Sequence, residues 1–336
     1  MQFAHTLTAW YEENKRSLPW RGERDPYKIW VSEIILQQTR VQQGWDYYLR
    51  FIDTFPDIQS LADATEEEVL RVWQGLGYYS RARNMHCAAQ QIITGHNGRF
   101  PSTYDEIRAL KGIGDYTAAA ISSIAFALPH PAVDGNVLRI VSRIFGVCED
   151  ISQNKTRKKI TAICEKLIDK ENPGAFNQAL MDFGATQCTP QNPQCRSCPF
   201  QKECYAFGQN MTNTLPIKSN NIVKKERYLH FVCYIHNSSI ILERRSRKDI
   251  WRNMYQFPLT ETSDASPLPQ MTPTLCIREV LTHQIIHASF YIKPVQTLPA
   301  LKADQIIANI TDMEKYPMPK IMVEFIKKTE LSNEQH

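Results

Sequence analysis

The sequence predicts two domains of different class: a mainly α-helical domain over residues 1–208 and a smaller α+β domain over residues 227–330. A length of 336 residues exceeds the usual size of a single domain. Apolar residues recur at spacings of three and four up to about residue 208, whereas β-rich runs dominate after residue 227. Residues 209–226 are polar and lack apolar periodicity, which indicates a linker.

The helical pattern of the first domain is amphipathic and interrupted by turn residues. Ser102 and Asp105 have the spacing of a helix cap, and Pro173-Gly174 separates two helical patterns. The predicted helical segments are 29–51, 66–73, 81–93, 116–127, 137–145 and 156–168.

The second domain begins with a predicted hairpin, in which strands 228–236 and 240–244 flank Asn237-Ser238-Ser239. Further strands are expected near 256–259, 276–281 and 288–295, and a helix over 320–328.

Composition sets broad limits on the class of protein. The chain is 43% hydrophobic and 22% charged, as folded proteins are, and its net charge of +4 permits a nucleic-acid partner without requiring one. The first residues do not have the pattern of a signal peptide, and no run approaches the roughly 18 apolar residues of a membrane helix. We therefore expect a soluble, cytoplasmic protein with no membrane partner.

Four of the nine cysteines fall within 17 residues, as Cys188-x6-Cys195-x2-Cys198-x5-Cys204. Short loops between cysteines gather four thiolates in a small volume, as an iron–sulfur cluster requires. A zinc knuckle uses the same ligand set. The remaining cysteines are expected to be buried apolar residues.

A second motif lies between two predicted helices, at residues 107–127. Gly112 and Gly114 allow backbone N–H groups at a helix start to approach a phosphate, and Lys111 adds a positive charge. Two glycines between helices also serve packing alone, so this motif by itself leaves both readings open.

Two carboxylates have environments that predict different ionisation. Glu33 lies on an otherwise apolar helix, which raises its pKa, unless it points to solvent or pairs with Arg40. Asp134 precedes a helix, where accepted N–H bonds would hold it ionised, and it could also be a plain N-cap. Cleavage of an N-glycosidic bond needs both an acid for the leaving base and an anion for the cationic sugar.

Three further segments carry a family resemblance: 32–39 (Ser-Glu-Ile-Ile-Leu-Gln-Gln-Thr), 75–84 (Gly-Leu-Gly-Tyr-Tyr-Ser-Arg-Ala-Arg-Asn) and 133–137 (Val-Asp-Gly-Asn-Val). With the cysteine spacing, they resemble the adenine DNA glycosylases (MutY) of the endonuclease III, or helix-hairpin-helix, superfamily, over roughly residues 5–208. The resemblance implies a helix-hairpin-helix glycosylase domain with one 4Fe-4S cluster in the loop 188–204. It also implies a monomeric base excision repair enzyme that acts on double-stranded DNA containing adenine opposite 8-oxoguanine or guanine.

The same resemblance implies residue roles. Glu33 would protonate N7 of adenine and Asp134 would stabilise the cationic sugar, with Asn136 and Tyr116 assisting. Tyr116 stands where the lyase members carry a Schiff-base lysine, so the enzyme is expected to be monofunctional.

DNA contacts are implied at several positions, since the target base must be flipped out of the duplex. Gln38 and Tyr78 match the intercalating residues, although Tyr78 and its neighbour Tyr79 could be ordinary aromatics. Arg81 and Arg83 are expected on a phosphate-facing side. The other expected contacts are Gln37, Thr39 and Leu76 on the same surface, Arg21 beside Trp20 near the adenine pocket, and Lys111, Gly112 and Gly114 at the phosphates.

Residues 251–258 resemble a segment of the MutT-like (Nudix-like) domain of this family. The hydrolase signature is absent, because residues 260–274 contain one Glu and no Gly, so this domain is expected to recognise rather than hydrolyse. The family's Phe-Ser-His loop is matched at 281–287, with Ile285 and Ile286 in place of Phe and Ser. His287 and Ser289 are the candidates for lesion recognition.

Two other functions remain open: an endonuclease III-like pyrimidine or mismatch glycosylase with lyase activity, and a non-catalytic iron–sulfur DNA-binding protein. The absence of lysine between Lys111 and Lys155 disfavours the first. The presence of both Glu33 and Asp134 disfavours the second.

Overall fold

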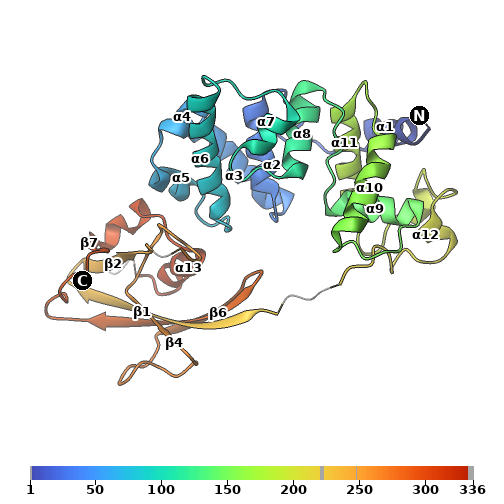
Figure 1. Ribbon diagram of the computed structural model, residues 1–336. Helices are drawn as coiled ribbons and strands as arrows, with labels where there is room; N and C mark the ends of the chain where they lie inside the picture. Colours follow the sequence, from blue (N-terminus) through green and yellow to red (C-terminus); the bar gives the residue numbers. More distant parts are fainter. Residues whose placement is uncertain (1, 220–222, 247, 332–336) are drawn as a thin grey trace. The chain divides into compact units, whose positions relative to one another are not determined.

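The computed structural model describes residues 2–219, 223–246 and 248–331. It confirms the predicted fold class, a helical domain followed by an α+β domain with a mixed sheet (Figure 1). The chain divides into two compact units, Met1–Asp63 with Cys87–Asn220 and Ala64–His86 with Asn221–His336. Part of the predicted linker, residues 220–222, lies outside the described residues.

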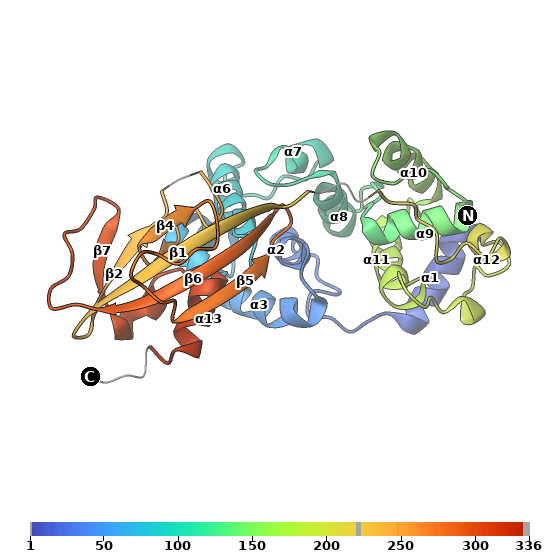
Figure 2. The ribbon, with the colours of Figure 1, turned by 90° about the horizontal axis from the view of Figure 1, so that it is seen from below.

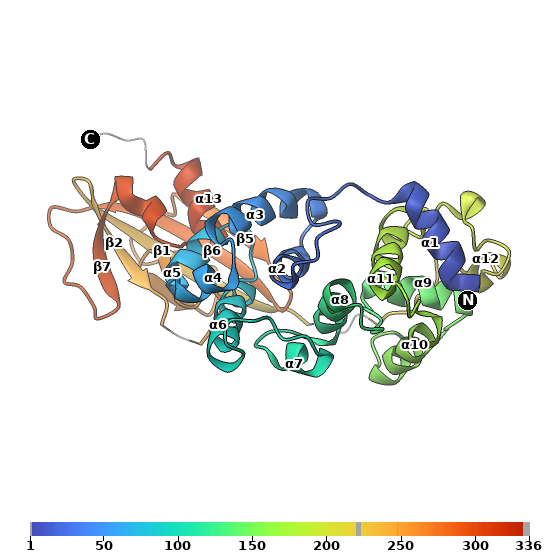
Figure 3. The ribbon, with the colours of Figure 1, turned by 90° about the horizontal axis from the view of Figure 1, so that it is seen from above.

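The first unit is helical. Helix α2 packs against α3 and α8, while α1 and α9 pack against α11, and α10 and α12 pack against α9 (Figure 3). Among the described residues, no helix is both long enough and apolar enough to span a bilayer. The helices are α1 (Gln2–Asn14), α2 (Pro26–Leu36), α3 (Val41–Thr54), α4 (Ile58–Asp63), α7 (Tyr104–Ala109), α8 (Asp115–Phe126), α9 (Gly135–Phe145), α10 (Asn154–Leu167), α11 (Pro173–Asp182), a π-helical turn η1 (Phe183–Gln187), a 3-10 turn η2 (Cys195–Ser197) and α12 (Tyr205–Gly208); α6 (Ser80–Gly95) runs from the second unit into this one.

Two local predictions in this unit were wrong. The segment 29–51 is two helices, because Gln38 adopts a left-handed backbone (φ 55°) that ends α2 before α3 begins. Helix α7 is capped by Thr103 rather than Ser102, since the Thr103 hydroxyl accepts the N–H of Glu106 at 3.3 Å. The spacing of apolar residues continues across Gln38 and so did not reveal the break, and Ser102 and Thr103 are adjacent residues that can both cap a helix.

The helix-hairpin-helix consists of α7, a tight turn and α8. Gly112 has φ +80°, a left-handed conformation that favours glycine. Gly114 is the N-cap of α8 and supplies no side-chain cap, so the first N–H groups of this helix are left for another acceptor.

The second unit contains one mixed seven-stranded sheet in which β1 and β6 run parallel and the other pairs are antiparallel (Figure 2). Its core lies where α13 meets the sheet: Phe290 stacks on Phe325 with ring centroids 4.4 Å apart. The elements are β1 (Lys225–His236), β2 (Ser239–Arg244), β3 (Tyr255–Gln256), β4 (Leu259–Thr262), β5 (Leu275–Val280), β6 (Gln284–Pro294), β7 (Gln305–Asn309), a 3-10 turn η3 (Ile310–Lys315) and α13 (Lys320–Lys328).

Helix α13 has the predicted bounds, whereas the expected strand 256–259 is two short strands, β3 and β4, that pair with different neighbours. Strand β7 was not expected. Residues 64–86 include α5 (Glu66–Val72) and make several contacts within this unit. Asn253 donates to Glu66 at 2.7 Å, and the backbone N–H of Met318 donates to Gln74 at 3.0 Å.

Candidate active site

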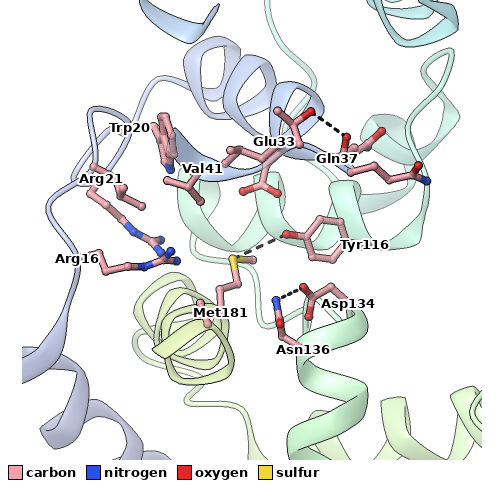
Figure 4. Close-up of a pocket in the computed structure, with 15 residues that line it drawn as sticks. Arg16, Trp20, Arg21, Glu33, Gln37, Val41, Tyr116, Asp134, Asn136 and Met181 are labelled. Carbon is pink, nitrogen blue, oxygen red and sulfur yellow. Dashed lines mark hydrogen bonds between the residues drawn. The ribbon is translucent and has the colours of Figure 1, made fainter. Parts of the chain in front are cut away.

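A cavity of about 480 Å³ opens in the first unit, where the α1–α2 connector, α2, α8, the start of α9 and the end of α11 meet (Figure 4). Its wall brings together residues separated by up to 169 positions in the chain. The predicted site residues that line it are Arg21, Glu33, Gln37, Gln38, Thr39, Tyr116, Asp134 and Asn136. The sequence analysis did not include Arg16, Leu18, Val41 and Met181, which line it as well.

Glu33 is the buried acid of this cavity. It sits in α2, is 8% exposed, and points its carboxyl group into the cavity (Figure 4). Burial raises its pKa, and the nearby Asp134 adds to this, while a hydrogen bond from Tyr116 and the charge of Arg21 oppose it. The environment therefore favours the protonated form, as the sequence analysis expected, and the side chain does not point to solvent.

Asp134 is the N-cap of α9. Its carboxylate accepts the backbone N–H of Val137 and the side-chain amide of Asn136, both at 2.8 Å. The sequence analysis expected these bonds to hold Asp134 ionised; they do lower its pKa, but burial, which the sequence analysis did not weigh for this residue, raises the pKa by more. The capping geometry was right, but the cavity wall removes more hydration than a surface cap would lose.

Tyr116 and Asn136 complete the polar wall. The Tyr116 hydroxyl contacts the Met181 sulfur at 3.8 Å, and burial followed by the charge of Glu33 raises its pKa. Asn136 lies against Gly184, where an added Cβ would come within 2.6 Å of the Asn136 side chain. A glycine at position 184 is therefore needed for this packing.

A chain of hydrogen bonds leads from Asp134 away from the cavity. Asn136, which donates to Asp134, accepts from Nη2 of Arg139 at 2.9 Å. The same guanidinium donates to the carbonyl oxygens of Gly184 at 2.7 Å and Cys188 at 2.8 Å. The carboxylate is thus connected through two side chains to the start of the cysteine-rich loop.

The residues predicted to face DNA in this unit lie beside the cavity. Gln38 is exposed, and the amide of Gln37 donates to the Thr117 hydroxyl at 3.2 Å. Gln37 and Tyr116 also border a second cavity of about 690 Å³, which Gly112 and Gly114 line. Lys111 is exposed at the same hairpin.

The four clustered cysteines are free and partly buried, and three of them pack against the core of α1, α9, α10 and α11. Arg143, 2% exposed, donates to the Cys188 sulfur at 3.5 Å, and the Cys204 thiol donates to the carbonyl oxygen of Arg143 at 3.5 Å. Burial first, and then the other three thiols, raise the pKa of Cys198 to about 12. The four thiols therefore lie close enough to raise one another's pKa.

The arrangement of these thiols bears on which group they fit. A single zinc ion with four thiolates requires sulfur atoms only about 3.8 Å apart, from Zn–S bonds of about 2.3 Å. A 4Fe-4S cluster uses the same donor set of four thiolates, so by their chemistry the four cysteines, which are free and partly buried, fit either group.

In the second unit, Tyr78 stands on a strained turn. Gly75 and Gly77 have positive φ of 92° and 77°, and Tyr78 itself has φ 49° and is 46% exposed. Its hydroxyl lies 2.9 Å from that of Thr282, in the turn between β5 and β6. The alternative that Tyr78 is a core aromatic does not hold, although Tyr79 is buried.

Three neighbouring predictions need correction. Leu76 is only 7% exposed, because it packs into the core, so its expected place on the DNA-facing surface is not supported. Arg81 is buried, donates to the carbonyl oxygen of Gly77 at 3.2 Å and lies over the Trp73 ring, which makes it a support of the turn. Arg83 donates to the backbone of Arg252 at 2.9 Å rather than standing free toward a phosphate.

The candidates for lesion recognition lie in mid-strand on β6. His287 contacts Glu226 at 3.2 Å and stacks on Tyr228, and Ser289 lies 3.8 Å from the Cys276 sulfur. Thr282 lies outside β6, in the turn that precedes this strand, five positions before His287 in the sequence.

The sequence analysis missed Thr282. In the match with the Phe-Ser-His loop, Ile286 takes the place of the serine directly before His287, so that position carries no hydroxyl. The triplet Leu281-Thr282-His283 has the order apolar, hydroxyl, histidine and was the available signal.

A helical hairpin beside a cavity with a buried acid and a capping carboxylate defines a helix-hairpin-helix DNA glycosylase. Residues 31–169 match the HhH-GPD superfamily of base excision DNA repair proteins. A thermostable thymine-DNA glycosylase of known structure is 29% identical, with a TM-score of 0.57, covering 62% of this chain and 96% of that one.

Curated relatives narrow the class. The adenine DNA glycosylase of Buchnera aphidicola subsp. Baizongia pistaciae is 35% identical over 301 residues, covering 87% of this chain and 85% of the relative. That of Buchnera aphidicola subsp. Acyrthosiphon pisum is 37% identical over 257 residues, covering 76% and 73%. The chain belongs to the adenine DNA glycosylase family.

Proposed function

We propose that this protein is a monofunctional glycosylase that removes adenine paired with 8-oxoguanine or guanine in double-stranded DNA, and so begins base excision repair. The observation that carries the proposal is the buried Glu33 carboxyl group, which shares one cavity with Asp134 and Tyr116. The family relationship supports adenine as the base.

Glu33 acts as the general acid. An extruded adenine enters the cavity, and the protonated carboxyl group of Glu33 donates a proton to N7, so the base leaves as a neutral molecule. Burial raises the pKa of Glu33, so the carboxyl group keeps its proton to a higher pH than an exposed glutamate would. A general acid of this kind contributes about 10²–10⁴-fold to the rate.

Asp134 acts as the anion that faces the sugar. Loss of the base leaves an oxocarbenium-like deoxyribose, and a carboxylate close to it lowers the energy of that state. The same positive charge favours the ionised form of Asp134, opposing the raised pKa that burial imposes on the free enzyme. Asn136 holds the carboxylate in place at 2.8 Å.

The chemistry ends with water rather than with an enzyme amine. Lysine is absent from the residues that line the described cavity, whose basic side chains are Arg16 and Arg21. Arginine stays protonated and cannot form a Schiff base at neutral pH. The expected products are free adenine and an intact strand with an abasic site.

Cys188, Cys195, Cys198 and Cys204 would hold one 4Fe-4S cluster. When bound, the cluster supplies a covalent cross-link that fixes the loop 188–204. Arg143 braces this loop from α9, because it donates to the carbonyl oxygens of Thr189 at 2.7 Å and Pro190 at 3.1 Å. The loop's backbone in turn holds Arg139.

In the second unit, Tyr78 would insert into the base stack, since its turn is pre-formed and its ring is exposed. Thr282 supplies a hydroxyl next to the Tyr78 hydroxyl, suited to a hydrogen bond with the base opposite adenine. Thr282 and His283 therefore replace His287 and Ser289 as the proposed lesion-recognition residues.

The test is base release from defined duplexes. Purified protein is incubated with adenine opposite 8-oxoguanine, adenine opposite guanine, and thymine glycol opposite adenine, with and without alkali. We expect free adenine from the first two and strand breaks only after alkali. Release of the oxidised pyrimidine with spontaneous nicking would establish the lyase alternative, and DNA binding without release would establish a binding protein.

The Glu33→Gln variant tests the mechanism in the same assay. We expect a loss of about 10²–10⁴-fold in the single-turnover rate. Glu12→Gln is the matched control, because Glu12 is an exposed residue of α1 that pairs with Lys15. An undiminished rate in Glu33→Gln would exclude Glu33 as the acid.

A further inference from the structure

A third carboxylate lies behind the cavity wall. Asp182, the last residue of α11, has a side chain that is 0% exposed. It accepts the backbone N–H of Arg16 at 3.1 Å, two side-chain bonds from Arg16 at 2.6 and 3.0 Å, and one from Arg21 at 2.5 Å. No step of the proposed mechanism uses it.

Both arginines belong to the connector between α1 and α2, and both line the catalytic cavity. Trp20, between them, also lines it, as does Met181, the neighbour of Asp182 in α11. One buried carboxylate thus ties a segment without regular structure to the end of a helix. Figure 4 shows the two guanidinium groups side by side across the cavity from Tyr116.

The connector presents a donor to the cavity region. The Nε–H of Arg21 is buried and has no hydrogen-bond partner among the described residues. Purine ring nitrogens are acceptors, so a fixed N–H at this wall suits an extruded purine. A donor contributes to recognition of the purine only if its position is fixed. Burying a charged group such as this guanidinium without an oppositely charged partner is costly.

We propose that Asp182 is a positioning residue for adenine excision, which fixes Arg16 and Arg21 at the wall that meets the extruded purine and offsets their charge beside Glu33. The proposal rests on the proposed function, since it assigns Asp182 a role in that reaction. It differs from a purely structural ion pair because it predicts an effect on the protonation of Glu33.

The charges around Glu33 give the direction of that effect. Tyr116 from α8 and Arg21 from the connector lower the pKa of Glu33, and Asp134 from the start of α9 raises it. Asp182 is in contact with Arg21 and opposes its charge. Loss of the Asp182 charge leaves Arg21 uncompensated, so Glu33 loses its proton at a lower pH.

The experiment measures the single-turnover rate of adenine release against pH. The rate should fall at high pH, as Glu33 loses its proton; this fall is called the basic limb. For Asp182→Asn, which keeps the shape of the side chain, we expect the basic limb to move to lower pH by about one unit. For Arg21→Gln, which removes the positive charge, we expect the basic limb to move up, with a lower plateau from the lost donor. In the double variant the basic limb should return close to that of the unmodified protein.

Glu149→Gln is the control, because Glu149 is exposed and pairs with Lys159 in the same unit. Its pH profile should not change. Thermal unfolding of every variant at one pH shows whether the fold survives. If Asp182→Asn does not fold, the pH profiles of Arg21→Gln and Arg16→Gln alone test the role of the ion pairs. Asp182→Glu should keep the rate of adenine release only if the carboxylate itself is needed.

The outcomes separate this inference from the proposed function. If the unmodified protein releases no adenine, the proposed function fails and this inference fails with it. If it releases adenine but neither Asp182→Asn nor Arg21→Gln moves the basic limb, only the role of Asp182 is overturned. The role of Asp182 is likewise overturned if Asp182→Asn lowers the rate but leaves the basic limb at the same pH, because structural damage alone lowers the plateau of the profile.

Discussion

Nη2 of Arg139 donates to Oδ1 of Asn136 at 2.9 Å, and this bond places Asn136 to hold Asp134. Arg139 is largely buried, and its other bonds go to the backbone of Gly184 and Cys188. The position of the anion in the cavity therefore depends on the backbone of the segment that leads into the cysteine loop.

Replacing Arg139 by Gln should lower the single-turnover rate of adenine release by about tenfold or more, because Asp134 is no longer held for the transition state. It should also lower the free energy of unfolding by about 1–3 kcal/mol, since buried carbonyl groups lose their donor. Arg99→Gln, at an exposed position of the same unit, is the control. Equal rates for the two variants would show that the Arg139–Asn136 bond has no role in positioning.

The pH–rate profile should be bell-shaped. Activity needs protonated Glu33, whose pKa is raised, so the rate falls as pH rises through that pKa. It also needs ionised Asp134, whose pKa is raised as well, so the rate falls as pH drops through that one. Tyr116→Phe removes the hydrogen bond that lowers the pKa of Glu33 and should shift the basic limb to higher pH. An unshifted limb would mean that the bond to Glu33 does not matter in solution.

Glu33→Gln should unfold at a higher temperature than the unmodified protein at pH 8, with a smaller difference at pH 5. A carboxyl group with a raised pKa in the folded state contributes stability at low pH and loses it as pH rises through the folded pKa. Each pKa unit corresponds to about 1.4 kcal/mol. Calorimetry at the two pH values tests this, and a lower midpoint at pH 8 would argue that the charge of Glu33 is compensated.

Cys198→Ser should abolish stoichiometric iron and the visible absorbance of the purified protein, and should reduce DNA binding by disordering the loop 188–204. Cys87→Ser is the control, because Cys87 lies outside the motif and is exposed; the expectation that the remaining cysteines are buried holds for Cys164 and Cys233 but was wrong for Cys87 and Cys276. Bound zinc in place of iron in the unmodified protein would contradict the cluster assignment.

Thr282→Val should reduce the preference for 8-oxoguanine over guanine opposite adenine, because it removes the hydroxyl beside Tyr78 while keeping the shape. The expected cost is about 1–2 kcal/mol, or roughly 5–30-fold in the ratio of rates. Tyr78→Phe removes only the partner hydroxyl and should have a smaller effect. Thr272→Val, at an exposed loop position, is the control and should leave the ratio of rates unchanged. An unchanged ratio in Thr282→Val would mean that the base opposite adenine is recognised elsewhere.

Local patterns in the sequence were sufficient for the parts of this protein that short-range chemistry controls. The spacing of apolar residues predicted the bounds of α13. It also distinguished the helical part of the chain from the part that forms the sheet. The residues before α9 predicted Asp134 as an N-cap, and the apolar surroundings of Glu33 predicted its burial. These are properties of neighbours along the chain, so spacing reports them.

The tertiary structure decided what depends on residues distant in sequence. It brought Arg16, Arg21 and Asp182 to one wall across 161 and more positions, and it placed Thr282 against Tyr78 across 204. It also raised the pKa of Asp134, where the cap alone predicted the opposite. A carboxyl group loses hydration to the residues that pack against it in the folded protein, and these residues are distant in the sequence. The pattern of neighbouring residues therefore does not predict the shift in its pKa.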